Sequence, residues 1–250
     1  MNFAVIIPAR YQSTRFPGKP LAMIGRKPMI QWVYENAVKE VTEVWVATDN
    51  EEIYNTVVKF GGKAVETLST HQSGTDRCAE AAKIISAKSG FDVIINVQGD
   101  EPFISPTQIE ALKSCFQSDA DIATLIKKID SEEELFNANR PKVVTDKELN
   151  ALYFSRSPIP YLRGTEKSFW HQAHTYWAHI GMYAYRFDVL QKIAQLQTGL
   201  LEKAESLEQL RWLENGFKIR TAVTAHQSMG IDTPEDLQAA LQLLEKNQVF

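Results

Sequence analysis

Short apolar runs alternate with stretches of helical periodicity through the first half of the chain, and this alternation constrains the fold most. Each run is short and apolar, as expected of a buried strand. The predicted strands are Phe3–Ile7, Val44–Ala47, Lys63–Val65 and Asp92–Val97, and the predicted helices between them cover Pro28–Lys39, 50–60 and 74–88. Strands that alternate with helices imply a parallel sheet with right-handed crossovers, so the sequence predicts an α/β fold.

The pattern changes after about residue 120. Ile122–Ile129, Lys142–Thr145 and Leu152–Ser155 are predicted strands without long helices between them. Residues 161–178 are aromatic and His-rich, and we expect them to be irregular. We therefore expect one domain over residues 1–250 with a mixed, mainly parallel sheet. A hairpin-rich subdomain inserted at about residues 128–180 would cover the site and contact a second copy of the chain.

Composition excludes several classes of protein. The formal net charge of −4 argues against a general nucleic-acid surface, which needs an excess of Lys and Arg. Cys78 and Cys115 are far apart and lack metal-ligand spacing, so we expect neither a disulfide nor a zinc site, and a reducing cytoplasm fits. No stretch approaches ~18 consecutive apolar residues, so we expect no membrane span.

A basic loop follows the first predicted strand. It carries Arg10, Arg15 and Lys19, and Pro-Gly-Lys-Pro closes it at Pro20. The loop matches neither the Walker A pattern nor the dinucleotide-binding glycine pattern. Because ligands of α/β sheets bind at the carboxyl ends of the strands, the three cations predict a phosphate site. The alternative is a solvated basic loop, in which the cations would repel one another without an anion.

Two acidic segments are candidates for metal binding. Asp100 follows the strand Asp92–Val97, at the edge of the sheet that also carries the basic loop. Carboxylates with phosphate oxygens and water are the ligands that Mg²⁺ prefers. Asp232 precedes Pro234 at the start of a predicted helix, so it is either a second ligand or a helix cap, and Thr233 could cap equally well.

A third segment, residues 71–77, lies between a short strand and a helix. Ser73, Gly74 and Thr75 would expose backbone N–H groups at the helix N-terminus, which suits an anion or a base edge. Arg77 follows one turn later. It would bind the same ligand, or it would be a solvated helix charge paired with Asp76.

These segments together resemble the sugar nucleotidyltransferases, and most closely the cytidylyltransferases that activate 3-deoxy-manno-octulosonate (Kdo). The chain carries the family patterns in family order, from Ile7 to Asp236. In this chain they read I-P-A-R-x-x-S-x-R-x-P-G-K-P, H-x-S-G-T-D-R, N-V-Q-G-D-E-P, A-L-Y-F-S-R, L-E-Q-L-R and G-I-D-T-P-E-D, the last of which resembles the family's G-V-D-T-P-E-D. The resemblance implies a Rossmann-like nucleotidyltransferase domain.

The resemblance also implies which residues bind the nucleotide and the metal. Mg²⁺ would bind Asp100 and Asp232, and these two residues would act in catalysis with Arg10 and Lys19. The residues implied to bind CTP are Pro8, Ala9, Arg10, Ser13, Arg15, Lys19, Ser73, Gly74, Arg77 and Gln98.

Sugar binding is implied for the second half of the chain. An Arg side chain matches the geometry of the Kdo carboxylate, and Arg156 and Arg163 are the candidates. The remaining residues implied to bind Kdo are Gln98, His179, Tyr183, Glu208 and Gln209. Ala178 departs from the family, since many members have Arg before this His. By spacing, Leu207 and Leu210 should be helix core.

The activity implied by the resemblance is CTP + Kdo → CMP-Kdo + pyrophosphate, which activates Kdo for lipopolysaccharide synthesis. A homodimer is expected, with CTP and Kdo as small-molecule substrates. The alternatives are a cytidylyltransferase for 8-amino-Kdo or a sialic acid, and, from a different class, a nucleotide-binding regulator without turnover. The intact pair Asp100 and Asp232 argues against the regulator, which could lose its metal ligands.

Overall fold

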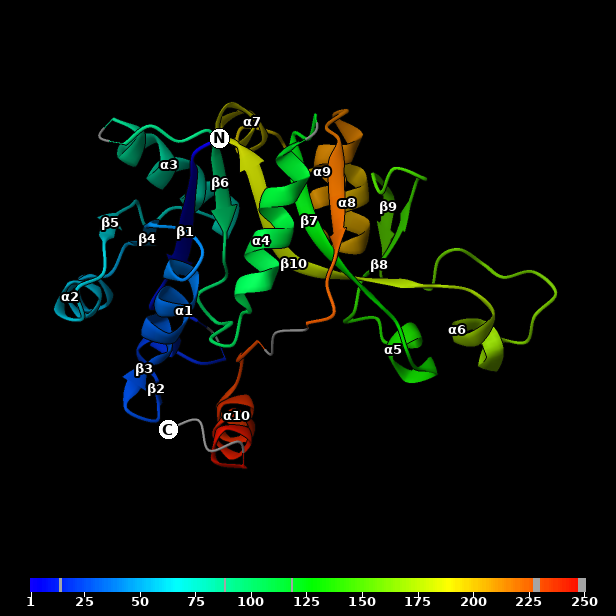
Figure 1. Cartoon of the computed structure of the whole chain (residues 1–250), viewed down its shortest axis with the longest axis horizontal. Helices are drawn as coiled ribbons and strands as arrows, with labels where there is room; N and C mark the ends of the chain where they lie inside the picture. Colours follow the sequence, from blue (N-terminus) through cyan, green and yellow to red (C-terminus); the bar gives the residue numbers. More distant parts are fainter. Residues whose placement is uncertain (14, 88, 118, 227–229, 247–250) are drawn as a thin grey trace. The chain divides into compact units, whose positions relative to one another are not determined.

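A computed structural model of the chain describes residues 1–13, 15–87, 89–117, 119–226 and 230–246, which group into two compact units (Figure 1). The first unit combines residues 1–109 with 228–250, and the second covers 110–227. The chain passes from one to the other within α4 (Pro106–Ser114). The predicted insert at about 128–180 falls inside the second unit, and the expected organisation as one domain with an insert stays a prediction.

The first unit is built on a parallel sheet with the strand order β6-β1-β4-β5. Its strands are β1 (Phe3–Ala9), β4 (Glu43–Thr48), β5 (Ala64–Glu66) and β6 (Val93–Asn96). Ile6 of β1 lies beside Asn96 on one side and Trp45 on the other. The predicted parallel α/β architecture is therefore confirmed, because the apolar runs are the strands and Ala4–Ile7 is fully buried.

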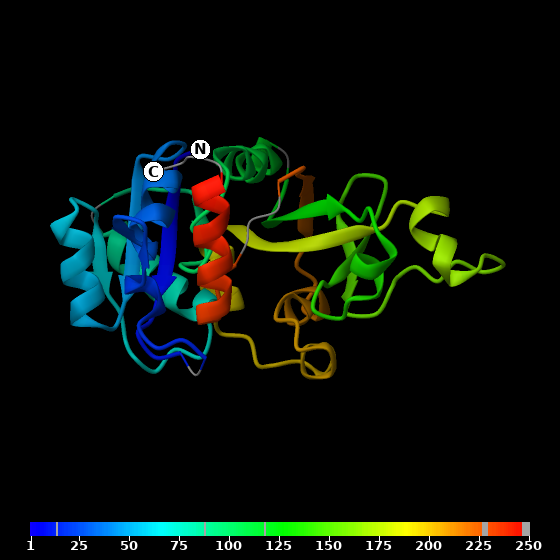
Figure 2. The same cartoon turned by 90° about the horizontal axis from the view of Figure 1, so that it is seen from below.

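Helices of this unit begin where the sequence predicts them. They are α1 (Met29–Val38), α2 (Glu51–Lys59), α3 (Gly74–Ser86) and the C-terminal α10 (Pro234–Lys246). The Asn50 side chain accepts a hydrogen bond from the Ile53 N–H and caps α2. A small hairpin of β2 (Met23–Ile24) and β3 (Lys27–Pro28) precedes α1. Ala240 of α10 shares a core cluster with Ile24, which anchors α10 beside the first elements of the chain (Figure 2).

Mixed pairing characterises the second unit. Its strands are β7 (Ile122–Lys128), β8 (Lys142–Thr145), β9 (Ala151–Ser155), β10 (Trp177–Arg186) and β11 (Ile219–Val223). β11 pairs parallel with β7, whereas β7, β10, β8 and β9 pair antiparallel in that order. Short helices complete the unit: α5 (Glu132–Phe136), α6 (Trp170–Ala173), α7 (Phe187–Ile193), α8 (Leu200–Glu205) and α9 (Gln209–Glu214).

Residues 161–178 are more ordered than the sequence suggested. They contain α6 and the first residues of β10. Trp170 is buried, and the rings of Tyr161 and Tyr176 pack against it at centroid distances of 4.9 Å and 6.3 Å. The prediction of an irregular segment was wrong for Lys167–Ala173 and for the start of β10, because a cluster of aromatic side chains supplies a local core that periodicity does not reveal.

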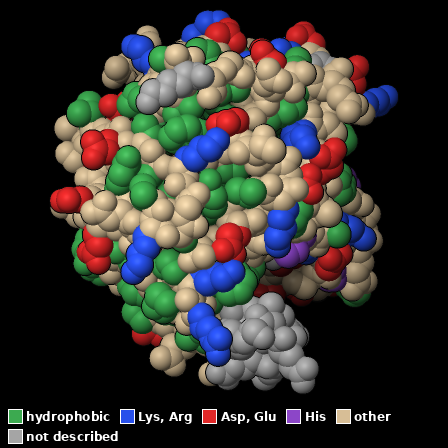
Figure 3. All heavy atoms as spheres, turned by 60° about the vertical axis from the view of Figure 1, so that its left-hand side comes forward, with side chains coloured by type: hydrophobic (Ala, Val, Ile, Leu, Met, Phe, Trp, Pro, Cys, Tyr) green, Lys and Arg blue, Asp and Glu red, His purple; other side chains and the backbone are tan. Residues whose placement is uncertain are grey.

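On the face shown in Figure 3, basic and acidic side chains are interspersed among hydrophobic ones. This mixture fits a chain with 27 Lys and Arg against 31 Asp and Glu. Within the described residues, the structure contains no helix that could cross a membrane.

Candidate active site

A cavity of about 850 Å³ opens at the carboxyl ends of β1 and β6. The loop after β1, the segment before α3, the loop after β6 and Asp232 form its walls. All ten residues predicted to bind CTP line this cavity, and so do Asp100 and Asp232. The structure therefore brings the predicted nucleotide and metal residues together within the first unit.

Close approach of the loops after β1 and β6 requires a glycine at position 99. A Cβ atom on Gly99 would lie 2.9 Å from the Pro8 carbonyl oxygen, which is too short for a real contact. A backbone carbonyl cannot swing aside as a flexible side chain can, so any side chain here would push the two loops apart. Gly99 thus fixes Asp100 next to the loop that carries the cations.

The basic loop closes on itself. Gly18 has a φ of +68°, a conformation that favours glycine, and its N–H donates to the Tyr11 carbonyl at 2.8 Å. Ser13 Oγ accepts a hydrogen bond from the Phe16 N–H at 3.3 Å. The bend at Gly18 turns Lys19 back toward the cavity, where it begins a short 3-10 turn, Lys19–Leu21.

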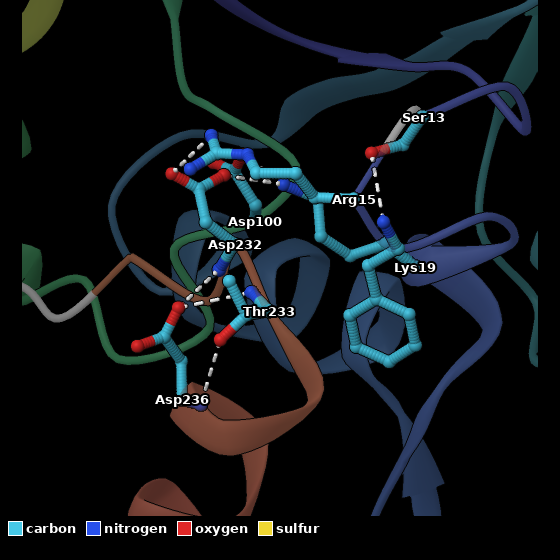
Figure 4. Close-up of polar contacts among 8 residues, drawn as sticks. Ser13, Arg15, Lys19, Asp100, Asp232, Thr233 and Asp236 are labelled. Atoms are coloured by element: carbon cyan, nitrogen blue, oxygen red, sulfur yellow. Dashed lines mark hydrogen bonds and ion pairs between the residues drawn. The ribbon is translucent and has the colours of Figure 1, made fainter.

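Asp100 and Asp232 converge on this loop. The Ile231 N–H donates to the Asp100 carbonyl at 2.9 Å, which joins the two acidic segments. Lys19 Nζ lies 2.6 Å from Asp100 Oδ2 and 3.0 Å from Asp232 Oδ1, and Arg15 Nη2 lies 3.1 Å from Asp232 Oδ2 (Figure 4). The carboxylates thus offset the repulsion expected between Arg15 and Lys19, while the Arg15 side chain stays 64% exposed.

The start of α10 shows which residues cap this helix. Thr233 Oγ1 accepts from the Asp236 N–H at 3.2 Å, and Asp236 Oδ2 accepts from the N–H groups of Asp232 and Thr233 at 3.0 Å and 2.9 Å. These backbone hydrogen bonds lower the pKa of Asp236. Thr233 and Asp236 therefore cap the helix, and the reading of Asp232 as the cap is wrong. The Asp232 carboxylate faces Lys19 instead (Figure 4).

A capping box begins α3. Ser73 Oγ accepts from the Asp76 N–H, and Asp76 Oδ2 accepts from the Ser73 N–H, both at 3.2 Å. Arg77 is only 4% exposed, and its Nη1 donates to Thr67 Oγ1 at 2.6 Å and lies 3.4 Å from Asp49 Oδ1. The readings of Arg77 as a solvated charge and as a partner of Asp76 were therefore wrong. Through its hydrogen bond to Thr67, the Arg77 side chain, which lines the cavity, fixes the segment before α3.

Glu80 is a supporting residue that the sequence reasoning missed. Its Oε2 accepts from the Leu68 N–H at 2.8 Å and lies 2.5 Å from His71 Nε2. Both partners belong to the segment before α3, and His71 itself lines the cavity. Glu80 follows Arg77 by three residues, so the two side chains share one face of α3. That spacing was the available signal.

Most residues predicted to bind the sugar lie in the second unit, with Gln98 in the first. His179 and Tyr183 of β10 have ring centroids 5.3 Å apart, and Tyr183 packs against Trp212 of α9 at 5.1 Å. Glu208 Oε1 accepts a hydrogen bond from Arg211 Nη2. Gln209 Nε2 is buried and has no hydrogen-bond partner among the described residues. Buried polar groups without partners suit a ligand rich in hydroxyls.

Arg156 and Arg163, the candidate ligands of the Kdo carboxylate, lie in different surroundings. Arg156 donates to three backbone carbonyls, those of Glu205, Ala138 and Ser206, at 2.7 Å, 3.0 Å and 3.2 Å. Arg163 is exposed. A guanidinium has five N–H donors, so Arg156 keeps two for a ligand while it holds the backbone. The carboxylate role of both residues stays a prediction. Leu207 and Leu210 are buried core residues, as predicted.

Burial gives His179 a measurable pH signature. It lowers the pKa of His179 from 6.5 to about 3, and Nε2 lies 2.9 Å from Thr124 Oγ1. Between pH 6.5 and 3 the unfolded chain therefore binds a proton at His179 that the folded protein excludes. The contribution of His179 to the free energy of unfolding is present above pH 6.5 and is lost as the pH falls toward 3. We expect His179→Gln to reduce the acid-side fall in unfolding free energy by up to about 1.4 kcal/mol per pH unit. Urea unfolding from pH 7 to 4 measures this, and equal slopes for both proteins would contradict it.

Comparison with known proteins places these features in context. A family model for cytidylyltransferases matches residues 4–219. A 3-deoxy-manno-octulosonate cytidylyltransferase of Parabacteroides distasonis is 55% identical over 249 residues and covers 98% of each chain. One from Cytophaga hutchinsonii is 57% identical over 240 residues, with 95% of each chain covered. A solved structure of CMP:2-keto-3-deoxy-manno-octonic acid synthetase complexed with CTP is similar at a TM-score of 0.90 and 44% identity, over 99% of this chain and 100% of that one.

Proposed function

The chain belongs to the cytidylyltransferase family, as a relative of the 3-deoxy-manno-octulosonate cytidylyltransferases, and from this we propose that it transfers CMP from CTP to Kdo. The reaction forms a bond between the anomeric oxygen of Kdo and the α-phosphorus of CTP. It breaks the bond from the α-phosphorus to the bridging oxygen, so pyrophosphate leaves, and the hydroxyl proton is lost to solvent.

One observation supports this proposal above all. The residues predicted for the nucleotide and the metal come from segments far apart in the sequence, yet all of them line one cavity at the carboxyl ends of β1 and β6. This is where α/β sheets bind their ligands. The cavity combines three cations, Arg10, Arg15 and Lys19, with two carboxylates.

Charge neutralisation is the main task of the protein in such a transfer, because the protein has little covalent chemistry to supply. Arg10, Arg15 and Lys19 would hold the triphosphate and stabilise the charge that develops on the departing pyrophosphate. The N–H groups at the start of α3, beside Ser73 and Gly74, would bind a further phosphate oxygen or the base edge.

The acidic pair fits a divalent cation. Carboxylate oxygens of Asp100 and Asp232 already converge on one cationic atom, Lys19 Nζ. Among the described residues no cluster of three or more His, Cys, Asp or Glu is placed to bind metal, so the protein would offer these two carboxylates. That suits Mg²⁺, which takes one or two carboxylates and completes its shell with phosphate oxygens and water. Bound Mg²⁺ would neutralise phosphate charge and lower the pKa of the sugar hydroxyl.

A panel of acid sugars tests the proposed function. The purified protein with CTP and Mg²⁺ should release pyrophosphate with Kdo and form CMP-Kdo, while an uncharged aldose should give no product. CTP binding without pyrophosphate release for any sugar would contradict the proposal and favour the nucleotide-binding regulator. Release with a sialic acid alone would move the substrate to another acid sugar.

Kdo should be preferred over 8-amino-Kdo. This expectation rests on the segment His71–Thr75, which resembles the Kdo-type motif, whereas relatives specific for the amino sugar tend to lack this His. Competition at equal, sub-saturating concentrations reports the ratio of kcat/KM directly. We expect Kdo to be used about tenfold faster or more, as for the loss of one favourable polar contact. A preference for the amine would change the substrate and leave the reaction class intact.

A homodimer, a cytoplasmic location and a role in lipopolysaccharide synthesis complete the proposal. Each follows from the resemblance to the Kdo enzymes and stays a prediction. The oligomeric state is open to direct measurement by light scattering of the purified chain.

A further inference from the structure

We propose that the Lys19 ammonium occupies the position of the metal ion in the nucleotide-free protein, where it forms ion pairs with Asp100 and Asp232. CTP must bind the ammonium and displace it from the two carboxylates before a divalent cation binds there. The inference rests on the proposed metal role of the two carboxylates. It adds that Lys19 couples metal binding to nucleotide binding, so the free protein binds the metal weakly.

Geometry gives the first argument. A single atom, Lys19 Nζ, contacts Asp100 Oδ2 at 2.6 Å and Asp232 Oδ1 at 3.0 Å. Arg15 Nη2 contacts the other oxygen of Asp232 at 3.1 Å. The protein's own cations therefore engage three of the four carboxylate oxygens, and a metal ion cannot share the same lone pairs with them.

Backbone restraint is the second argument. The hydrogen bond from the Ile231 N–H to the Asp100 carbonyl joins the two acidic segments, and Gly99 holds Asp100 against the loop after β1. These contacts hold the backbone of both acidic segments next to Lys19. We therefore expect a metal ion to bind the two carboxylates by exchange with the ammonium.

Burial makes Lys19 the main competitor. Its side chain is 13% exposed, whereas that of Arg15 is 64% exposed. An ion pair shielded from water is screened less than an exposed one. Arg15 is thus a weak competitor, and removal of Lys19 alone should open the site.

The Lys19 side chain has room to rotate away from the two carboxylates. Its backbone is fixed in the turn after Gly18, where the Ala22 N–H donates to the Lys19 carbonyl at 3.0 Å. The four-carbon stem can still rotate within a cavity that also presents Arg10 and Ser73. Phosphates bound there would replace the two carboxylates as ion-pair partners of the ammonium, and both carboxylates would become available to a metal ion. By linkage, CTP and metal would then strengthen each other's binding equally.

Mn²⁺ binding without nucleotide tests the exchange, because the free ion can be counted by electron paramagnetic resonance. Lys19→Met should bind Mn²⁺ about tenfold more tightly than the unmodified protein, as for removal of one charge-assisted competitor. Lys63→Met is the matched control. It removes the same charge from a lysine that pairs with Glu43 at 2.8 Å outside the cavity, and it should leave Mn²⁺ binding unchanged.

Two further variants test whether the lost charge of Lys19 causes the gain and whether the metal ion binds at Asp100. Lys19→Gln, also uncharged but able to donate hydrogen bonds to the carboxylates, should tighten Mn²⁺ binding as well, and it replaces Lys19→Met if that protein unfolds. Adding Asp100→Asn to either variant should abolish the gain, which locates the metal at this pair. CTP without sugar should improve Mn²⁺ binding by a larger factor in the unmodified protein than in Lys19→Met.

Unchanged or weaker Mn²⁺ binding by both folded Lys19 variants would overturn the exchange. So would a gain that survives Asp100→Asn, because the metal would then lie elsewhere. Neither result depends on turnover, so the exchange can fail while pyrophosphate release with Kdo stands. Conversely, absent pyrophosphate release would refute the proposed function and leave the metal titration readable.

Discussion

Asp100→Asn should lower kcat by about 10³-fold or more while the protein stays folded. Asn has nearly the same shape as Asp, so the loop after β6 and the hydrogen bond from Ile231 to the residue-100 carbonyl are kept. The variant loses one of the two negative charges that would hold Mg²⁺. Pyrophosphate release at saturating CTP, Kdo and Mg²⁺ measures kcat, and circular dichroism checks the fold.

Glu101→Gln is the control for this prediction. It removes a neighbouring carboxylate from the same turn, one that does not line the cavity, and it should keep near-normal kcat. Near-normal activity of Asp100→Asn at saturating Mg²⁺ would refute the metal assignment. An unchanged kcat with a raised KM for Kdo would instead assign Asp100 to sugar binding.

The position of Asp100 could be predicted because topology alone sets it. A strongly apolar strand ends at Asn96, and the acidic turn follows it directly. Parallel pairing of β1 and β6 then places this turn next to the loop after β1. The sequence could not show that a Cβ atom at position 99 would lie only 2.9 Å from the Pro8 carbonyl oxygen, because that distance depends on how the two loops pack.

The start of α10 shows where local reasoning fails. Asp232, Thr233 and Asp236 are all suitable cap residues, so propensity cannot choose among them. The choice is made by tertiary structure: the Ile231 N–H is bound to the Asp100 carbonyl, and the Asp232 carboxylate meets Lys19. Only the resemblance to the Kdo enzymes pointed to Asp232 as a metal ligand, whereas its position just before a predicted helix favoured a helix cap.

Arg77 and Lys19 illustrate a second limit. A charged residue in the first turn of a helix is usually solvated, yet Arg77 is buried because Thr67 and Asp49 supply its partners from other segments. Lys19 was predicted to contact phosphates, and without nucleotide it contacts two carboxylates. In both cases the sequence indicated the right cavity, while the partners depended on residues up to 213 positions away.

A buried lysine organises the second unit. Lys142 of β8 is fully buried, and its Nζ donates to the carbonyls of Asn137, Arg140 and Arg156 at 3.0 Å, 2.8 Å and 2.6 Å. Burial lowers the pKa of Lys142. The three carbonyls nevertheless use all three of its N–H donors. Lys142 thus joins the loop after α5 to Arg156, the candidate ligand of the Kdo carboxylate.

Lys142→Met should destabilise the protein by about 3–5 kcal/mol, a large part of the usual 5–15 kcal/mol for a domain. Met fills a similar volume but removes the donor from three carbonyls that are at least partly shielded around the buried ammonium, and each buried unsatisfied group costs about 1–3 kcal/mol. Lys147→Met is the matched control, since Lys147 is exposed in the turn between β8 and β9 and should change stability by less than about 0.5 kcal/mol. Urea unfolding of both variants, followed by fluorescence and circular dichroism, gives the two free energies. A loss no larger than that of the control would mean that the three carbonyls find other donors, and Lys142 would then not be what holds this part of the second unit.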